Sequence, residues 1–303
     1  MIYKVIVTND RNESITLDLF DPFSSGFVVR SIDGLGPVDA DLNFAESAPV
    51  DGGSFNGARQ GTRNIVFDLV FLDTNVSIER VRHLSYKYWP VKRKVKIRVE
   101  TDERTLETDG YVEKNEPAIW ADDFEGCQIS VLCESPYFTN PKEMTNKLSD
   151  VVDSFHFPFA SEEDPGELTF GYLNVNRDVI VKNQGDVSTG VIFELRAYGS
   201  VTNPVIYNYL TREWFGLTFT MIEGDIIRIN TQRGNKTVTL TREGVTYNII
   251  NYMTSSVEGS ASSLTWLQLD VGDQAFVLYF EEWETDPSLL DLIIKHKDQY
   301  LGV

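Results

Sequence analysis

Short segments in which apolar and polar residues alternate recur along this chain, with glycine-containing turns between them. This period of two places successive side chains on opposite faces of a β-strand. In the second half the segments are regularly spaced, at residues 178–183, 191–198, 204–208, 217–222, 225–230, 237–240, 264–269 and 275–280. Gly224 and Gly234 separate such segments, and glycine readily supplies the positive φ of a hairpin turn. This rhythm predicts a β-sandwich in the second half.

The first half is also rich in alternating segments but contains one helical pattern. The expected strands cover residues 2–7, 15–20, 64–72, 95–100, 110–116 and 126–133, the first two forming a hairpin around residues 9–12. Between them, Ile78, Val81 and Leu84 recur at helical spacing after Ser77, a residue suited to an N-cap, and Pro90 ends the pattern. The order predicts an α+β domain, with β-sheets or a split barrel and one helix.

A glycine- and proline-rich passage, residues 33–61, interrupts these strands. A long irregular segment inside a compact domain is uncommon and usually has a function. Two interpretations are open. The passage is either an ordinary loop or a β-arm that becomes ordered against a neighbouring subunit.

The 303 residues favour two domains. An acidic stretch at residues 140–165 is expected to be irregular, so we place the boundary there, with an N-terminal domain at 1–140, a C-terminal domain at 141–303 and a crossover linker at about 141–165. Residues 287–300 carry apolar side chains at spacings that predict a terminal helix.

The formal net charge of −19 opposes electrostatic binding to nucleic acid or to anionic lipid, so the expected partners are proteins. Against this background, residues 80–98 contain 8 of the 27 basic residues within 19 positions. We call Lys92, Arg93, Lys94, Lys96 and Arg98 the basic island. It is either a solvated surface or a complementary contact with an acidic copy of this chain or another partner.

The start of the chain alternates apolar and polar residues, and no apolar run approaches the ~18 residues of a membrane span. We therefore expect neither secretion nor membrane insertion. Cys127 and Cys133 lie six positions apart on one predicted strand, roughly 20 Å by the rise per residue, which is too far for a disulfide. Both are expected to be buried apolar residues.

No catalytic, cofactor or metal site is predicted. His83, His156 and His296 are scattered, and no nucleophile or phosphate-loop signature occurs. The one pattern compatible with enzyme chemistry is the acidic run of Glu281, Glu282 and Glu284 beside aromatic residues, since glycosidases use paired carboxylates.

Sugar binding without hydrolysis stays open as an alternative. Trp214, Trp266 and Tyr209 lie in or beside strands of the predicted sandwich, and aromatic rings of this kind can stack on sugars. The ordinary interpretation is that these rings belong to the core. An exposed aromatic platform on the sandwich would favour carbohydrate binding.

Several short motifs, in order along nearly the whole chain, resemble the distal tail protein (Dit) family of siphovirus-type phages. They are residues 51–54, 63–67 followed by the helix at 79–88, 128–133 and 136–138 in the first half, and 203–206, 224–225 with 229–231, Lys236 with Val238, 266–269 and 272–273 in the second.

This resemblance implies a structural, non-enzymatic virion protein at the tip of a phage tail, assembled in the host cytoplasm. The N-terminal domains would form a hexameric ring, with the basic island as a possible ring interface, between the tail tube protein and the tail-associated hub or lysin protein. The C-terminal sandwich would resemble galectins or carbohydrate-binding modules. It would dock receptor-binding or other baseplate proteins and contribute to host adhesion. The alternative function is that of a carbohydrate-binding protein whose C-terminal sandwich contacts a host-surface saccharide.

Overall fold

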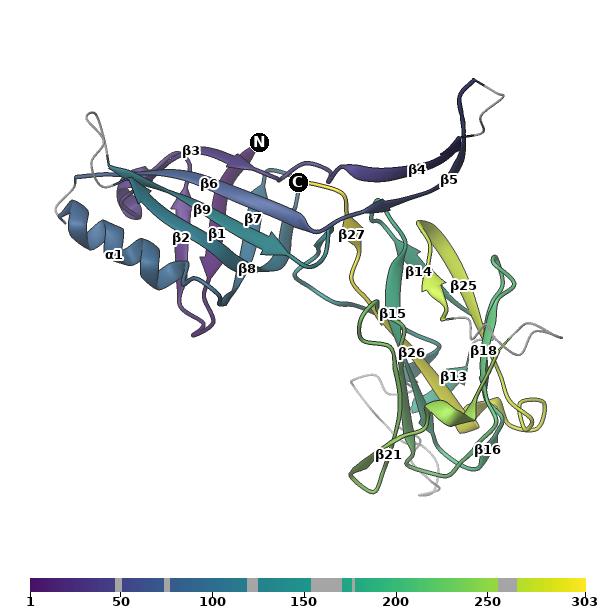
Figure 1. Cartoon of the computed structure of the whole chain (residues 1–303). Coiled ribbons are helices and arrows are strands. Elements are labelled where there is room, and N and C mark those ends of the chain that lie inside the picture. The colour runs from purple at the N-terminus through teal and green to yellow at the C-terminus, as the bar shows by residue number, and fades with distance from the viewer. Residues whose placement is uncertain (47–50, 74–76, 119–124, 154–170, 176–177, 256–265) are drawn as a thin grey trace, which may run out of the picture. The chain divides into compact units, whose positions relative to one another are not determined.

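The structure is a computed structural model of the 303-residue chain that describes residues 1–46, 51–73, 77–118, 125–153, 171–175, 178–255 and 266–303 (Figure 1). The predicted mostly β fold is confirmed: antiparallel sheets dominate, and the described residues contain one α-helix. The chain forms two compact units. Unit 1 comprises Met1–Pro141 and Gln299–Val303, and unit 2 comprises Lys142–Asp298. The last five residues therefore belong to the unit in which the chain began.

Unit 1 contains a strongly curved antiparallel sheet. Its strands follow the order β2 (Ser14–Asp18), β1 (Ile2–Thr8), β7 (Lys94–Thr101), β8 (Thr105–Ala118), β9 (Gly126–Cys133), β6 (Arg63–Phe71) and β3 (Phe27–Asp33), and β8 also pairs with β10 (Phe138–Thr139), which pairs with β27 (Gln299–Tyr300). The two end strands, β2 and β3, contact each other, with the turn η1 (Pro22–Ser24) between them in the sequence. The sheet is thus an almost closed, split barrel.

The core of unit 1 forms because the strands alternate buried and exposed residues. In β6, for example, Ile65, Phe67 and Leu69 are fully buried. The helix α1 (Ile78–Tyr88) occupies the predicted place, contacts β6 and β8, and buries Val81. Trp89, which follows the helix, is fully buried, and its ring lies 5.9 Å from that of Phe67.

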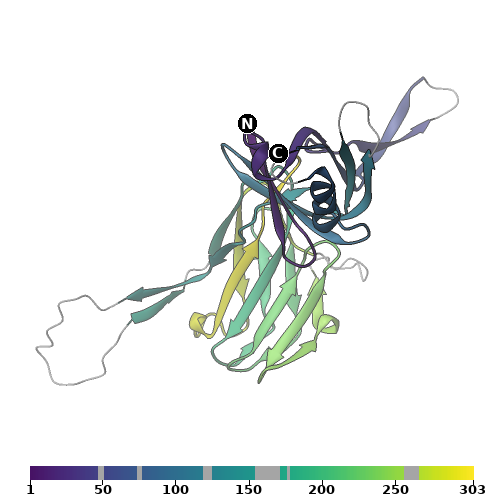
Figure 2. The same ribbon diagram turned by 90° about the vertical axis from the view of Figure 1, so that its left-hand side faces the viewer.

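Part of the glycine-rich passage forms a two-stranded ribbon. β4 (Ala40–Glu46) pairs with β5 (Gly53–Gln60), and neither pairs with any other described strand. Both views show this ribbon leading away from the sheet of unit 1 (Figures 1 and 2). Of the two interpretations left open for this passage, an ordinary loop is wrong for these strands, and order against a neighbouring subunit stays a prediction. Their sequence contains few apolar residues, and their glycines conceal the alternation.

Unit 2 contains two antiparallel sheets around a shared core, as expected for a sandwich. One follows the order β11 (Met144–Lys147), β26 (Leu290–His296), β15 (Thr189–Ala197), β20 (Ile226–Asn230), β21 (Thr237–Arg242) and β22 (Val245–Asn248), with β24 (Gln268–Leu269) on β15. The other follows β14 (Asp178–Asn183), β25 (Gly272–Tyr279), β17 (Val205–Asn208), β18 (Trp214–Leu217) and β23 (Met253–Ser255). Phe193 and Phe276 meet between the sheets, their ring centroids 5.4 Å apart.

Smaller elements complete unit 2: two ribbons, β12 (Ser149–Asp153) with β13 (Gly171–Val175) and β16 (Val201–Thr202) with β19 (Thr220–Met221), and two 3-10 turns, η2 (Ile250–Tyr252) and η3 (Pro287–Leu289). The expectation of irregular chain at residues 140–165 is therefore wrong for β11 and β12, while residues 154–165 lie outside the described part. β11 lies at one edge of the first sheet and pairs along one side with β26.

The predicted terminal helix is wrong. Residues 290–296 form β26, which lies between β11 and β15 and is buried at six of its seven positions. A strand covered on both faces presents a short run of apolar residues, and such a run cannot be distinguished from a buried helix by periodicity alone. No helix within the described ranges is both long enough and apolar enough to cross a membrane.

Candidate functional surfaces

Arg63 is the most deeply buried charge in unit 1, with none of its surface exposed. Its guanidinium donates hydrogen bonds to backbone carbonyl oxygens in three separate segments. Nε and Nη2 reach Pro136 at 2.9 and 2.5 Å, Nη1 reaches Gly36 at 2.6 Å and also Gly34, and Nη2 reaches Leu301 at 2.6 Å. Burial lowers the pKa of Arg63. The sequence placed this residue only in the motif at 63–67, just before the strand expected at 64–72. In the structure Arg63 joins the loop before the ribbon, the turn between β9 and β10, and the C-terminal tail.

The C-terminal tail makes further contacts within unit 1. The Arg104 guanidinium lies 4.6 Å from the ring centroid of Tyr300, and its Nη2 donates to the Gly302 carbonyl oxygen at 3.3 Å. The Val303 amide donates to the Leu35 carbonyl oxygen at 3.0 Å. The tail is therefore an integral part of unit 1, although it follows all of unit 2 in the sequence.

A groove marks the split in the barrel of unit 1. It has a volume of about 290 Å³ and is lined by residues from both ends of the sheet and the loop after β3, including Leu19, Pro22, Val29, Ile32 and Leu35. We call this groove the barrel seam. Phe20 and Phe23, which are 71% and 70% exposed, belong to the same β2–β3 connection. Apolar surface of this extent beside a groove is typical of a contact surface.

The β4–β5 ribbon is amphipathic. The register places Leu42 opposite Ala58 and Phe44 opposite Phe55, and the two phenylalanine rings meet at a centroid distance of 5.7 Å. The other face is polar, with Asp41 opposite Arg59. We call the face that carries Leu42, Phe44, Phe55 and Ala58 the apolar face of the ribbon. Its side chains are more than half exposed at Leu42 (59%), Phe44 (52%) and Phe55 (60%).

The basic island lies along β7 and the turn before it, and most of its charges have partners inside unit 1. Arg93 lies 3.8 Å from Asp10, Lys94 lies 3.0 Å from Asp109, and Lys96 and Arg98 lie 3.8 and 3.4 Å from Glu107. Lys92 occupies the turn, where its φ is 68°. The structure thus brings the predicted residues together on one surface, but neutralises much of their charge within the unit.

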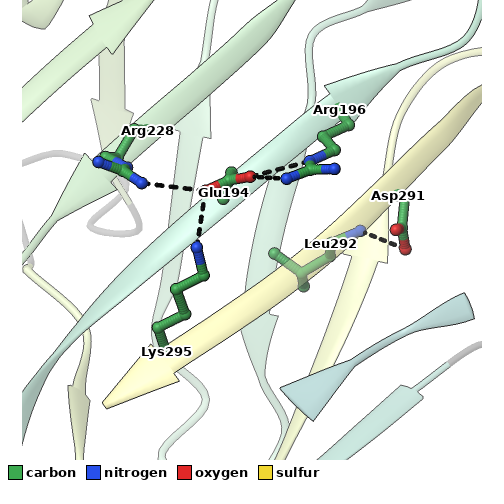
Figure 3. Close-up of polar contacts among 6 residues, drawn as sticks. All are labelled: Glu194, Arg196, Arg228, Asp291, Leu292 and Lys295. Atoms are coloured by element: carbon green, nitrogen blue, oxygen red, sulfur yellow. Dashed lines mark hydrogen bonds and ion pairs between the residues drawn. The ribbon is translucent and has the colours of Figure 1, made fainter. Parts of the chain in front are cut away.

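In unit 2, Glu194 lies at the centre of three cations on the outer face of its sheet (Figure 3). Its carboxylate accepts hydrogen bonds from Arg196 Nε at 2.8 Å, Lys295 Nζ at 3.1 Å and Arg228 Nη2 at 3.2 Å. Burial raises the pKa of Glu194, but these three donors outweigh burial and hold the pKa at about 2. The cluster depends on the pairing of β15 with β20 and β26, which sequence reasoning missed.

The other sheet of unit 2 has an apolar outer face. Strand alternation and register place Ile180, Val205, Tyr207, Trp214, Val277 and Tyr279 on it. Tyr207 lies opposite Trp214, and a methyl group at Gly216 would meet the indole ring of Trp214 at 3.0 Å. The indole therefore leans over a glycine. Of the other proposed sugar-stacking residues, Tyr209 is 67% exposed, whereas Trp266 packs against the core.

The acidic run has local structural roles. Glu282 accepts a hydrogen bond from the Thr202 amide at 2.9 Å, and hydrogen bonding to Thr202 lowers the pKa of Glu282. Glu281 accepts one from the Asn203 side chain at 2.6 Å. A lowered pKa is the opposite of what a general acid for glycoside hydrolysis needs.

Neither metal chemistry nor a reactive thiol is visible in the part of the chain that the structure describes. It holds no group of three or more His, Cys, Asp or Glu residues arranged for a metal ion. Cys127 and Cys133 are free and buried, as predicted, and burial raises their pKa values to about 12 and about 11. His156 lies outside the described residues.

Comparisons with known proteins agree with the fold. No protein-family model and no curated protein sequence matches the chain. Among solved structures, the chain is similar to the Dit protein of phage SPP1, described as a paradigm of the hub adsorption apparatus in phages that infect Gram-positive bacteria. The TM-score is 0.61 at 14% identity, over 97% of this chain and 98% of that one. It is also similar to a chain of the phage P2 baseplate in its activated, Ca-containing conformation, with a TM-score of 0.51 at 12% identity over 100% of both chains. The resemblance to the Dit family is thus confirmed at the level of the fold.

Proposed function

We propose that this protein is a structural component of a phage tail, placed at the distal end of the tail tube in the manner of a Dit protein. The observation that carries this proposal is the similarity of fold to the SPP1 Dit protein, which extends over nearly the full length of both chains. Both units are included in that similarity, so a shared β-sandwich alone does not account for it. The chain would be assembled in the host cytoplasm and act in the virion.

In this proposal, unit 1 forms a ring of six copies that joins the tail tube protein to the tail-associated hub or lysin protein. The exposed apolar side chains of the β4–β5 ribbon favour the hypothesis of a ring. Two-stranded ribbons are marginally stable in water on their own, and this one exposes the side chains of Leu42, Phe44 and Phe55. Contact with a neighbouring copy would bury them. A head-to-tail contact of this kind closes into a ring when its rotation allows.

The basic island would lie at the edge of this ring interface. Since Arg93, Lys94, Lys96 and Arg98 already face carboxylates of unit 1, their contribution would be to steer copies together and fix their register. Reversing Lys92, Arg93 and Lys94 to glutamate should then weaken the ring. Undiminished rings by native mass spectrometry would remove the island from the interface.

The mass of the assembled particle tests the proposal as a whole. Native mass spectrometry of the purified full-length chain, with and without the cognate tail tube protein, should show six protomers, and negative-stain images should show rings. A chain that remains monomeric at high concentration and in the presence of the tube protein would contradict the ring. Immunogold labelling of virions should place the protein at the tail tip.

Unit 2 would dock receptor-binding or other baseplate proteins. A second candidate function, binding of a host-surface saccharide, is favoured by one observation, the apolar outer face on which Trp214 leans over Gly216 beside Tyr207. An aromatic ring at the outer face of a sheet can stack on a sugar ring. A glycan array probed with the full chain, with Trp214→Ala as the comparison, tests this function. If no glycan gives a signal, or if the signals are unchanged in the variant, protein docking would be the remaining proposed role of unit 2.

A further inference from the structure

The outer face of the first sheet of unit 2 presents positive charge to solvent. Strand register places six charged side chains on this face, namely Lys147, Glu194, Arg196, Arg228, Asp291 and Lys295. The two carboxylates are only 3% and 5% exposed. The side chains of Arg196 and Arg228 are 44% and 55% exposed, and Lys147 is exposed as well. We call this surface the cationic face, because an approaching ligand meets its cations first.

Glu194 uses only part of the hydrogen-bonding capacity of its three cations (Figure 3). It accepts two N–H groups from Arg196, one from Arg228 and one from Lys295. An arginine has five N–H donors and a lysine three. With a pKa of about 2, Glu194 is ionised at neutral pH and balances one of the three positive charges. Asp291, opposite Arg196, accepts hydrogen bonds from two backbone amides.

Glu194 also gathers the three cations at one place. Arg228 lies directly opposite it on β20, Arg196 follows two residues later on β15, and Lys295 reaches it from β26. Neighbouring side chains on one sheet face lie within about 8 Å of one another. Side chains that are already held lose less conformational entropy when a ligand binds. Guanidinium groups match phosphate oxygens, and a tetrahedral phosphate presents oxygens in several directions, which suits donors that converge from three strands.

An extended ligand suits this face better than a single ion. Water competes strongly for one anion beside half-exposed cations. Lys147 adds a fourth cation on β11, and the hydroxyl-bearing Thr145 and Thr239 lie opposite Lys295 and Arg228. A polymer with repeated phosphates contacts the cluster and Lys147 together, and linked contacts strengthen one another.

The net charge of −19 does not prevent such a contact. At physiological ionic strength, charges are largely screened beyond about 8 Å. The charges within that distance of a ligand on the cationic face are mainly those of the face itself. Its exposed charges are positive, which is the complement of a polyanion.

We propose that the cationic face of unit 2 binds the phosphate groups of a linear phosphodiester polymer. Arg196, Arg228 and Lys295 donate to the oxygens of one phosphate, Lys147 attracts a neighbouring phosphate, and Glu194 is the positioning residue. This inference goes beyond the proposed function, in which unit 2 docks proteins or stacks on a sugar at its other sheet. It does not depend on the ring.

The affinity of the full chain for poly(glycerol phosphate), measured by biolayer interferometry at 0.15 M salt, tests the proposal. The wild type should bind this polymer and not neutral dextran, and Arg228→Gln should bind at least tenfold more weakly. Arg212→Gln, which removes the same charge from an exposed turn of the other sheet, is the matched control and should change the affinity less than twofold. Absence of binding, or equal losses in the two variants, would overturn the proposal.

Lysine footprinting provides a second test that needs no variant. Saturating poly(glycerol phosphate) should slow acetylation of Lys147 at least fivefold, and leave unchanged that of Lys182, which is exposed on β14 of the other sheet. Equal protection of Lys147 by polyglutamate would overturn the assignment to phosphate. Equal protection by inorganic phosphate, or protection only by phosphatidylglycerol vesicles, would overturn the assignment to a polymer. A chain that forms rings but fails both tests would refute this inference and leave the proposed function intact.

Discussion

Arg63 in unit 1 and Glu194 in unit 2 are both buried charged side chains, and the two are held in opposite ways. Arg63 in unit 1 is surrounded by neutral backbone carbonyls from residues 34, 36, 136 and 301. Glu194 in unit 2 is 3% exposed and is surrounded by three cations whose own side chains are 21–55% exposed. The first arrangement joins segments that are distant in the sequence. The second joins neighbouring strands that are already hydrogen-bonded to one another.

This difference indicates which unit depends on its buried charge. Removing Arg63 leaves the carbonyl oxygens of residues 34, 36, 136 and 301 without this donor, whereas the backbone hydrogen bond from Val303 to Leu35 still joins the tail to the loop before the ribbon. Removing Glu194 leaves cations that can turn towards water. We therefore expect unit 1 to respond more strongly to the loss of its central charge than unit 2.

The largest effect is expected for Arg63→Met. Because each buried acceptor without a donor costs about 1–3 kcal/mol, we expect the free energy of unfolding of unit 1 to fall by at least about 3 kcal/mol. Both cysteines of the chain lie in unit 1, and a buried thiol reacts only when the unit opens, so thiol labelling against denaturant concentration reports on unit 1 alone. Arg59→Met, at an exposed ion pair, is the matched control and should change little. A decrease in the free energy of unfolding of less than about 1 kcal/mol would show that unit 1 does not depend on the hydrogen bonds of Arg63.

Deletion of residues 299–303 should have the next largest effect. It removes the pairing of β27 with β10, the buried ring of Tyr300 and the Leu301 acceptor of Arg63. We expect unit 1 to lose about 2–4 kcal/mol, the range for losing a buried aromatic side chain with its hydrogen bonds. Hydrogen exchange should then increase around residues 34–36 and 136–139, while β14 and β25 of unit 2 remain protected. Unchanged exchange in unit 1 would contradict a structural role for the tail.

The sequence predicted the elements of this comparison better than their contacts. Alternation in β6 and β15 was clear, and both strands form where expected. The acceptors of Arg63 are up to 238 positions away, and no local pattern shows them. One partner of Glu194, Lys295, was assigned to a helix, so its place beside β15 was not predictable. The burial of a charge is decided by which strands pair in the folded chain. The strands could therefore be predicted from the sequence, but the buried positions of Arg63 and Glu194 could not.

The ribbon shows the same limit. The sequence left open whether residues 33–61 form a loop or an arm. The structure shows two strands at 40–46 and 53–60 whose apolar side chains lie on one face. A bulge at Asn56 puts Phe44 and Phe55 on that face together, and the glycines around it weaken the alternation that would have revealed it.

A smaller effect, dependent on pH, is expected for Glu194. The pKa of about 2 in the folded chain is below the ordinary value of 4.5, so its ion pairs stabilise unit 2 above about pH 4.5 and are lost as the pH falls towards 2. Because the three cations are partly solvated, we expect a contribution of about 1–2 kcal/mol. Glu194→Gln should reduce stability at pH 7 by that amount and flatten the dependence of the unfolding free energy between pH 5 and pH 2. An identical pH dependence in variant and wild type would show that other carboxylates dominate.

The smallest effect is expected for an exposed pair of unit 1, Lys94 with Asp109. Its side chains are 54% and 43% exposed, so hydration competes with an attraction across 3.0 Å. The neighbouring carboxylate raises the pKa of Lys94, which keeps the lysine charged throughout the neutral range. We expect Lys94→Met to change the free energy of unfolding of unit 1 by less than about 1 kcal/mol, and added salt to remove the difference. A larger loss, comparable to that of Arg63→Met, would mean that unit 1 depends on its surface charges as much as on its buried one, and the contrast between the two kinds of charge would no longer hold.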